Sequence, residues 1–166
     1  LKVPIEAAET VKLSFGSALA REVAARDTVE LARVDPRAKS VVSKKFISEI
    51  IEVRLAEILE FVDNELKSIG KAGRLPGGIV LSGGGAKLPG IVELVKQELK
   101  LSTQIGLPDA SVLGIDSAEL REKVEDPEFI SAIGLFFSGC DKILEAKTAR
   151  IPFRGAFKRI FGYFAP

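Results

Sequence analysis

One stretch of sequence decides the expected fold: Gly77-Gly78-Ile79-Val80-Leu81-Ser82-Gly83-Gly84-Gly85-Ala86-Lys87-Leu88-Pro89-Gly90-Ile91. Its apolar run, residues 79–81, has the length of a short buried strand and is bounded by glycines on both sides. The three glycines at 83–85 allow backbone angles that are closed to other residues. Pro89 stands where a first helical turn could begin, and apolar residues follow it at helical spacing. We therefore predict a strand, a glycine turn and a helix N-terminus, whose free amides suit a phosphate or a nucleotide.

The same turn has a plainer interpretation, in which the glycines serve only to make a tight corner. The stretch is not a P-loop, because no Gly-Lys-Ser/Thr sequence closes it. Its glycine spacing also differs from the dinucleotide-binding fingerprint. The choice between a corner and a ligand site therefore depends on the rest of the chain.

Length and composition indicate a folded protein of one domain or two small lobes. The chain has 166 residues, of which 46% are hydrophobic and 28% charged, with a formal net charge of +1. This balance is globular and gives no bias toward nucleic acid. One cysteine and no histidine exclude a disulfide framework, histidine catalysis and histidine metal sites, and indicate the cell interior. The chain also contains no methionine, so we expect a fragment that lacks its translated N-terminus.

Periodicity predicts a first helix over residues 4–20, followed by a hairpin. The helix has a proline in a permissive first-turn position and apolar residues at helical spacing. Glu9 and Lys12 lie three residues apart on one of its faces, which by itself indicates an ordinary solvated ion pair. Residues 28–34 alternate between apolar and polar, and residues 39–43 form a second short extended segment, so the two together predict a β-hairpin.

A longer helix is predicted from Ser43, its N-cap, to Ile69. Its apolar stripe is expected at Ile47, Ile51, Leu55, Ile58, Val62, Leu66 and Ile69. Its other face carries Lys44, Lys45, Glu49, Glu52 and Arg54, charges that alone indicate a solvated surface. Residues 70–78 are rich in glycine and predict the linker into the glycine stretch.

After the glycine stretch, the pattern predicts a strand over residues 102–107 and a polar loop over 109–125 with one helical turn. Asp126-Pro127-Glu128 then supplies an N-cap, a proline and a first-turn acid, which together predict a helix start. The buried stripe of this helix is expected at Phe129, Ile133, Phe136, Phe137, Cys140, Ile143 and Leu144. Cys140 is therefore interpreted as a buried apolar residue and not as a nucleophile.

The last segment, residues 151–166, has the composition of a helix that lies in a membrane interface. It combines aromatic residues with basic ones, and no acidic residue follows Glu145. Each basic residue would favour anionic lipid by about 1 kcal/mol. The residues expected to contact the membrane are Phe153, Arg154, Phe157, Lys158, Arg159, Ile160, Phe161 and Phe164. The plainer interpretation is a helix packed on the protein's own core.

Taken together, these segments resemble the C-terminal part of the FtsA family of bacterial cell-division proteins, in the actin/Hsp70 ATPase superfamily. The glycine segment alone is shared across the superfamily, whereas its order with the other motifs is more specific. The matching motifs are Glu6-Ala7-Ala8-Glu9-Thr10-Val11-Lys12, Phe15-Gly16-Ser17-Ala18-Leu19, Ser48-Glu49-Ile50-Ile51-Glu52-Val53-Arg54, residues 76–91, Asp126-Pro127-Glu128-Phe129 leading to Ala132-Ile133-Gly134-Leu135, and the terminal amphipathic helix.

The resemblance implies an α/β (α+β) fold, namely the second large subdomain of an actin-like ATPase of the ribonuclease H-like type. The nucleotide-cleft subdomain would comprise residues 1–20 and 73–148. A small inserted α/β subdomain that binds a partner would comprise residues 21–72. Residues 149–166 would form a linker and an amphipathic membrane-targeting helix.

The resemblance also implies an ATP site on one side of a cleft. The glycines would approach the ribose and phosphate, the lysine after them would lie near the adenine, and two residues of the first helix would line its other side. Mg²⁺ would accompany ATP only in the full-length protein, because the family's phosphate loops lie upstream. We therefore expect no ATP hydrolysis by this chain alone and assign no catalytic or metal-binding residue. The residues implied to bind the nucleotide are Gly83, Gly84, Gly85, Lys87, Glu9 and Lys12.

The implied function is that of an adaptor that polymerises in actin fashion, binds ATP and tethers division filaments to the cytoplasmic membrane at the septum. Lys44, Lys45 and Arg54 would dock the acidic C-terminal tail of the tubulin-like protein FtsZ. Copies of itself, other division proteins and anionic lipids on the inner membrane face would be further partners, and nucleic acid would not. Two alternatives remain: a PilM-type actin-like pilus-assembly protein, which shares the glycine motif, and a sugar or acid kinase of the superfamily.

Overall fold

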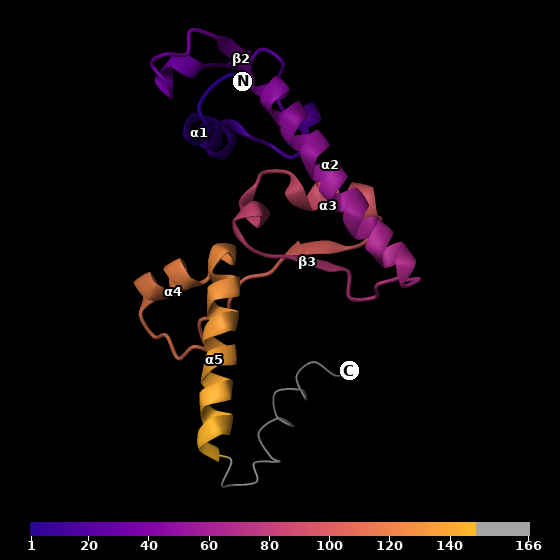
Figure 1. Cartoon of the computed structure of the whole chain (residues 1–166), viewed down its shortest axis with the longest axis vertical. Coiled ribbons are helices and arrows are strands. Elements are labelled where there is room, and N and C mark those ends of the chain that lie inside the picture. Colours follow the sequence, from indigo (N-terminus) through magenta and orange to yellow (C-terminus); the bar gives the residue numbers. More distant parts are fainter. Residues whose placement is uncertain (149–166) are drawn as a thin grey trace.

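The structure is a computed structural model of a mixed α/β chain, and it describes residues 1–148, with side-chain surroundings through Lys142 (Figure 1). No helix in this described part is both long and apolar enough to cross a membrane. The elements, in chain order, are α1 (Ile5–Phe15), η1 (Ala20–Glu22), β1 (Thr28–Glu30), η2 (Leu31–Arg33), β2 (Val41–Ser43), α2 (Lys44–Ser68), β3 (Ile79–Leu81), η3 (Gly84–Lys87), α3 (Ile91–Leu99), β4 (Thr103–Ile105), α4 (Ala118–Val124), η4 (Pro127–Phe129) and α5 (Ile130–Thr148), where η marks a 3₁₀ helix.

The long helix α2 connects two hydrophobic clusters. Near its start, Ile47 packs with Val11 of α1 and with buried residues of the β1 region. Farther along, Leu59 packs with Leu94 and other buried residues of α3. In Figure 1, α2 runs from the hairpin at one end to the level of β3 and α3. The predicted N-cap is confirmed, because the Ser43 hydroxyl accepts the Phe46 N–H at 3.1 Å.

The predicted apolar stripe of α2 is correct near its start and partly wrong farther along. Ile47 is buried, but Ile58 and Ile69 are 55% and 66% exposed. Leu59, which was not in the stripe, is buried against α3. Adjacent residues of an α-helix point about 100° apart. Because Leu59 faces α3, the side chain of Ile58 points away from the core.

The predicted hairpin is confirmed, with shorter strands than expected. β1 and β2 are antiparallel, with Val29 opposite Val42. The first strand ends early because the chain turns into η2 at Leu31, whose side chain is fully buried. The first helix also ends early, at Phe15, because Gly16 has an extended backbone and starts the buried segment 16–20.

The strand, glycine turn and helix of the opening stretch are confirmed. β3 pairs in parallel with β4, with Ile79 opposite Thr103, and α3 makes the connection between them. Ile79 and Leu81 pack toward the cluster that contains α3. Val80, on the other face of the sheet, is 56% exposed. The strand expected to be buried is therefore covered on one face within the described chain.

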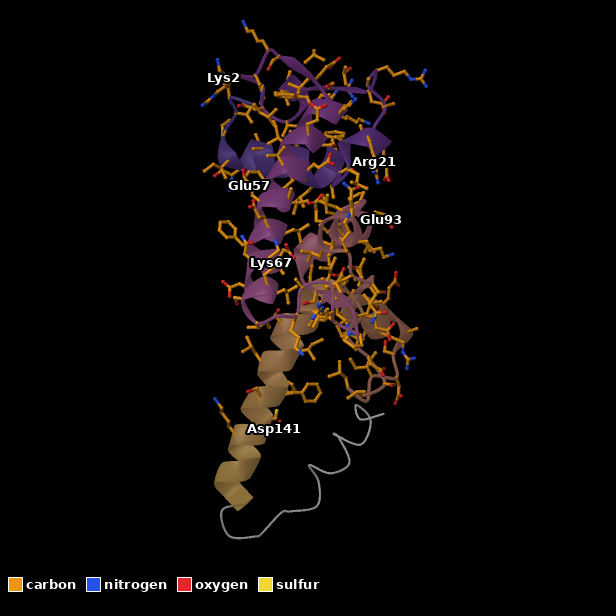
Figure 2. The ribbon with its side chains drawn as sticks, turned by 90° about the vertical axis from the view of Figure 1, so that its right-hand side faces the viewer. Lys2, Arg21, Glu57, Lys67, Glu93 and Asp141 are labelled. Atoms are coloured by element: carbon orange, nitrogen blue, oxygen red, sulfur yellow. The ribbon has the colours of Figure 1, made fainter. Side chains whose placement is uncertain are left out.

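The helix predicted from Asp126 is confirmed, but its buried stripe is wrong. Asp126 caps the 3₁₀ turn η4, and α5 follows directly. Phe129, Phe136 and Phe137 are 47%, 65% and 39% exposed, and Cys140 is half-buried. Both views show α5 extending beyond the rest of the described chain, so no second layer covers this stripe there (Figure 1, Figure 2). The side chains of Ile143 and Leu144, and the segment 149–166 that was predicted to be a linker and an amphipathic helix, lie outside the described residues.

Candidate functional site

The glycine turn forms the open junction between β3 and α3. Gly83 has a φ of 85°, which favours glycine, and its carbonyl accepts the Ala86 N–H at 3.0 Å. Gly84 and Gly85 do not have positive φ and are exposed. A Cβ on Gly85 would meet nothing within 4 Å, and one on Gly84 would meet only Glu128, at 3.4 Å or more. The tight corner therefore accounts for Gly83, but it does not account for Gly84 or Gly85.

Lys87 closes one side of this turn through two acidic partners. Its Nζ lies 2.7 Å from Asp126 Oδ2 and 3.3 Å from Glu128 Oε1. Hydrogen bonds to these two carboxylates raise the pKa of Lys87 above its usual value. The hydrogen bond from Lys87, followed by that from the Glu128 N–H, lowers the pKa of Asp126 below its usual range. Lys87 and Asp126 are therefore both charged near neutral pH.

Asp126 and Glu128 were not predicted as site residues. The sequence assigned them to a helix start, and Asp126 does cap that start. Their second role could not be found from local pattern, because Lys87 and Asp126 are 39 residues apart. Only the folded chain brings the two segments into contact.

The two predicted site residues of α1 pair with each other. Lys12 Nζ lies 2.7 Å from Glu9 Oε2, and both side chains are about half exposed, at 47% and 51%. The segment that follows α1 contacts the glycine stretch. There the Ala18 N–H and the Ser17 hydroxyl both donate to the Pro89 carbonyl, at 2.8 and 3.3 Å. Within the described residues, the charged groups of Glu9 and Lys12 pair with each other and not with the glycine turn.

The predicted partner-binding cations lie at the start and on the outer side of α2. Lys44 Nζ is 3.8 Å from Asp27 Oδ2 and 5.6 Å from the centre of the Phe15 ring. Arg54 pairs with Glu57 one turn later, and its side chain is 72% exposed. Lys45 is half-buried.

Sequence reasoning missed an exposed apolar stripe on the same helix. Phe46, Ile50 and Val53 are 49%, 42% and 59% exposed and follow one another at spacings of four and three residues. Such spacing places the three side chains on one face. The hydrophobic pattern that identified α2 was too broad to show which apolar residues the core would leave uncovered.

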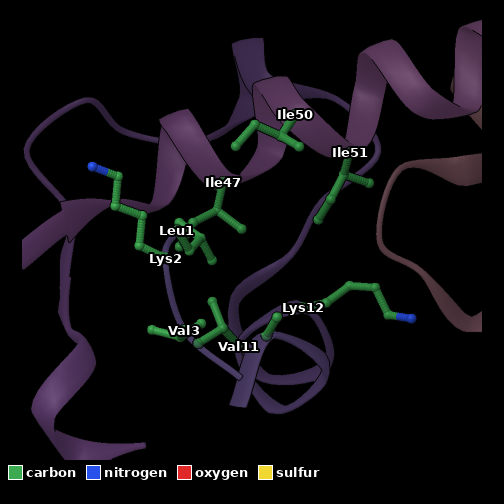
Figure 3. A pocket seen from close by; sticks show the side chains of 9 residues that line it. Leu1, Lys2, Val3, Val11, Lys12, Ile47, Ile50 and Ile51 are labelled. Atoms are coloured by element: carbon green, nitrogen blue, oxygen red, sulfur yellow. The ribbon is translucent and has the colours of Figure 1, made fainter. Parts of the chain in front are cut away.

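A cavity of about 310 Å³ lies away from the glycine turn, between residues 1–3, α1 and α2 (Figure 3). Val11 and Ile47 face each other across it, whereas the ammonium ends of Lys2 and Lys12 point outward. Its walls are almost wholly apolar, and the two lysines that line it, Lys2 and Lys12, turn their ammonium groups away from its interior, where a ribose or phosphate would need donors. We therefore place the candidate nucleotide site at the glycine turn and not in this cavity.

Comparison with known proteins identifies the family. The family model described as "Cell division protein FtsA" matches residues 1–134. The chain belongs to the FtsA family. The FtsA resemblance predicted from the sequence is thereby confirmed, and the pilus-assembly and kinase alternatives lose their support. The mixed α/β order of elements agrees with this family.

Three curated FtsA relatives, each described as "Cell division protein FtsA", show the extent of the similarity. The chain is 32% identical over 142 residues to that of Pseudomonas aeruginosa, covering 86% of this chain and 33% of the relative. It is 37% identical over 135 residues to that of Borreliella burgdorferi, covering 81% and 31%. It is 32% identical over 140 residues to that of Bacillus subtilis, covering 84% and 29%. The chain thus spans about a third of the length of these FtsA relatives.

Proposed function

We propose that this chain is part of an ATP-binding division adaptor, which polymerises in actin fashion and tethers FtsZ filaments to the cytoplasmic membrane at the division septum. The observation that carries the proposal is the FtsA family match over residues 1–134. Because the chain spans about a third of its relatives, polymerisation and any weak ATP hydrolysis belong to the proposal for the whole protein. Two surfaces of the described chain and the sequence of its last segment support three parts of the proposal.

The nucleotide part rests on the glycine turn. Gly84 and Gly85 are exposed and have no local steric need to lack a side chain. A ligand that lies against the backbone supplies such a need, and the flat base and ribose of ATP fit an open surface of this kind. The described residues include no group of three or more metal-binding side chains. Mg²⁺ is usually held by one or two carboxylates together with substrate phosphates, and we propose that it accompanies ATP in the whole protein.

The nucleotide site predicts that Gly84→Val weakens ATP binding by about tenfold or more, because the added side chain would occupy the space of the ligand. The fold should survive, since a Cβ here approaches no atom closer than 3.4 Å. The measurement is calorimetric ATP titration of the protein as its gene encodes it, with thermal unfolding as a check. Gly77→Val, at a position with nothing within 4 Å of a Cβ, is the matched control and should bind normally. Unchanged affinity in Gly84→Val would exclude this site.

The partner part rests on an exposed face of α2 that borders the cavity in Figure 3, because Ile50 lines that cavity. There the exposed stripe of Phe46, Ile50 and Val53 runs beside the exposed Arg54. An amphipathic acidic peptide can bury apolar side chains on such a stripe while its carboxylates pair with the arginine. The FtsZ tail is the peptide of this kind that the family suggests. The intrahelical Glu57 is the group with which that peptide would compete for Arg54.

The membrane part rests on the sequence of residues 149–166, whose aromatic and basic composition suits an anionic lipid surface. Such a segment binds more strongly as anionic lipid increases and as ionic strength falls.

A single flotation experiment tests the adaptor. Vesicles containing phosphatidylglycerol are mixed with the protein and a fluorescent FtsZ tail peptide and then floated through a density gradient. We expect the peptide to float only when the protein is present. Arg54→Glu should leave the protein on the vesicles and lose most of the peptide, whereas removal of residues 151–166 should lose both.

Arg33→Glu is the matched control for Arg54→Glu. Both arginines pair with a glutamate three residues away, and both are highly exposed, at 77% and 72%. Arg33 lies in η2 and not on α2, so reversal of its charge should leave peptide recruitment unchanged. Equal flotation of the protein with and without residues 151–166 would contradict the membrane part. A peptide that never binds the unchanged protein would contradict the partner part.

A further inference from the structure

The segment 126–128 closes over the glycine turn through three contacts, which we call the clasp. The Gly83 N–H donates to the Pro127 carbonyl at 2.8 Å. The Lys87 ammonium pairs with Asp126 at 2.7 Å and with Glu128 at 3.3 Å. These contacts hold both ends of the turn, because Gly83 begins it and Lys87 ends it.

The clasp is continuous with the start of α5. One oxygen of Asp126 accepts the Glu128 N–H at 2.9 Å, while the other binds Lys87. The Asp126 carbonyl also accepts the Phe129 N–H at 3.0 Å, and α5 begins at the next residue, Ile130. A change in the glycine turn that moves Lys87 would therefore move the first residues of α5.

Glu128 also limits what can lie on the turn. Its Oε1 is 3.4 Å from the place that a Cβ on Gly84 would occupy. A carboxylate at this position repels phosphate groups but accepts hydrogen bonds from hydroxyl or amino groups. The part of a nucleotide that lies next to Gly84 is therefore its sugar or its base.

We propose that Asp126 and Glu128 are positioning residues of the nucleotide site, which hold Lys87 and the glycine turn in their binding arrangement and couple occupancy of the turn to the start of α5. This inference rests on the proposed nucleotide function. Because coupling between two sites is reciprocal, a ligand that prefers the closed clasp also strengthens it.

A role of these ion pairs in stability alone can be distinguished from a role in ligand binding. Lys87, Asp126 and Glu128 are 46%, 27% and 52% exposed, and pairs with such exposure contribute little to stability. Loss of one carboxylate charge should then leave the protein folded. An effect on ligand binding in a folded variant therefore separates positioning from general stability.

The test uses ATP titration of the protein as its gene encodes it, for Asp126→Asn, Glu128→Gln, Lys87→Gln and the double variant Lys87→Gln with Glu128→Gln. Asn at 126 keeps an oxygen for the Glu128 N–H, so the helix cap remains. Each single change should weaken ATP binding by about fivefold or more. The double variant should bind no more weakly than the worse single one, because the clasp acts as a unit. Lys87→Arg keeps the positive charge that Lys87→Gln removes, so it should keep most of the ATP affinity of the unchanged protein.

Hydrogen exchange supplies a readout that a structural role would not move. In the unchanged protein, ATP should slow exchange at the Gly83 amide and at the first amides of α5. In Asp126→Asn and Glu128→Gln, saturating ATP should protect the turn without protecting α5. Glu119→Gln is the control, because it breaks another exposed ion pair, with Lys123 at 2.7 Å, and should change neither measurement.

Two results would overturn the inference in distinguishable ways. If the unchanged protein binds ATP and the two carboxylate variants bind it equally well, the clasp has no positioning role and the proposed nucleotide function stands. If the unchanged protein does not bind ATP, the proposed nucleotide function fails and the inference fails with it.

Discussion

Gly78→Ala is expected to lower the free energy of unfolding by about 3 kcal/mol or more. Gly78 has a φ of 68°, and a Cβ there would lie 2.3 Å from the Ser102 carbonyl oxygen and 3.0 Å from its carbon. That oxygen accepts the Ile79 N–H at 2.7 Å, next to the first paired residues of β3 and β4. The added methyl group can be accommodated only if one strand shifts, which disrupts the parallel pairing that positions the glycine turn.

Two other glycines separate the cost of the positive φ from the cost of the contact with Ser102. Gly70 also has a φ of 68°, but a Cβ there meets nothing within 4 Å. Gly70→Ala should therefore lower the free energy of unfolding only by the cost of placing alanine in a left-handed backbone conformation, about 1 kcal/mol. Gly77 lacks a positive φ and also has open space, so Gly77→Ala should be close to neutral. Denaturant unfolding of the three variants measures the differences. A Gly78 variant no less stable than the Gly70 variant would show that Ser102 moves away freely.

Leu19→Ala is expected to cost about 3 to 4 kcal/mol of unfolding free energy. Leu19 is fully buried in the cluster that α2 and α3 share. It packs against Gly90, where a Cβ would lie 3.5 Å from three of its carbon atoms. Removing its side chain leaves a cavity in the segment that joins α1 to the end of the glycine stretch.

Leu13→Ala provides the control for Leu19→Ala, because Leu13 is on α1 but 75% exposed. Its loss should change the free energy of unfolding by about 0.5 kcal/mol at most. Leu19→Ala should also weaken ATP binding at temperatures where it remains folded, since α1 and the glycine turn are held together through its segment. Equal stability of the two variants in denaturant titrations would show that this segment is not part of the core.

The sequence by itself predicted the elements whose signals are local. The strand, glycine turn and helix around residues 79–99 were correct, because glycine and periodic apolar residues act within a few positions. The Ser43 cap and the Asp126 cap were also correct, since a cap needs only its own next turn. The family resemblance, built on these motifs, was confirmed by the match over residues 1–134.

The tertiary structure alone decided which surfaces are covered. Periodicity could not tell that Leu59 is buried and Ile58 exposed, because both are apolar and α3 selects between them. It also predicted burial for Phe136 on α5, which the described chain leaves uncovered. Burial depends on a neighbour that is distant in sequence, and a local pattern does not identify that neighbour.

The sequence predicted one part of the candidate site, and only the tertiary structure decided the other part. The glycines at 83–85 were predicted from their residue type, and Lys87 was implied by the family resemblance. The sequence could not show that Gly84 and Gly85 are open while Gly83 alone is needed for the corner, nor that Asp126 and Glu128 hold Lys87. Those facts depend on contacts made across 39 residues of chain, and only folding brings such groups within hydrogen-bond distance.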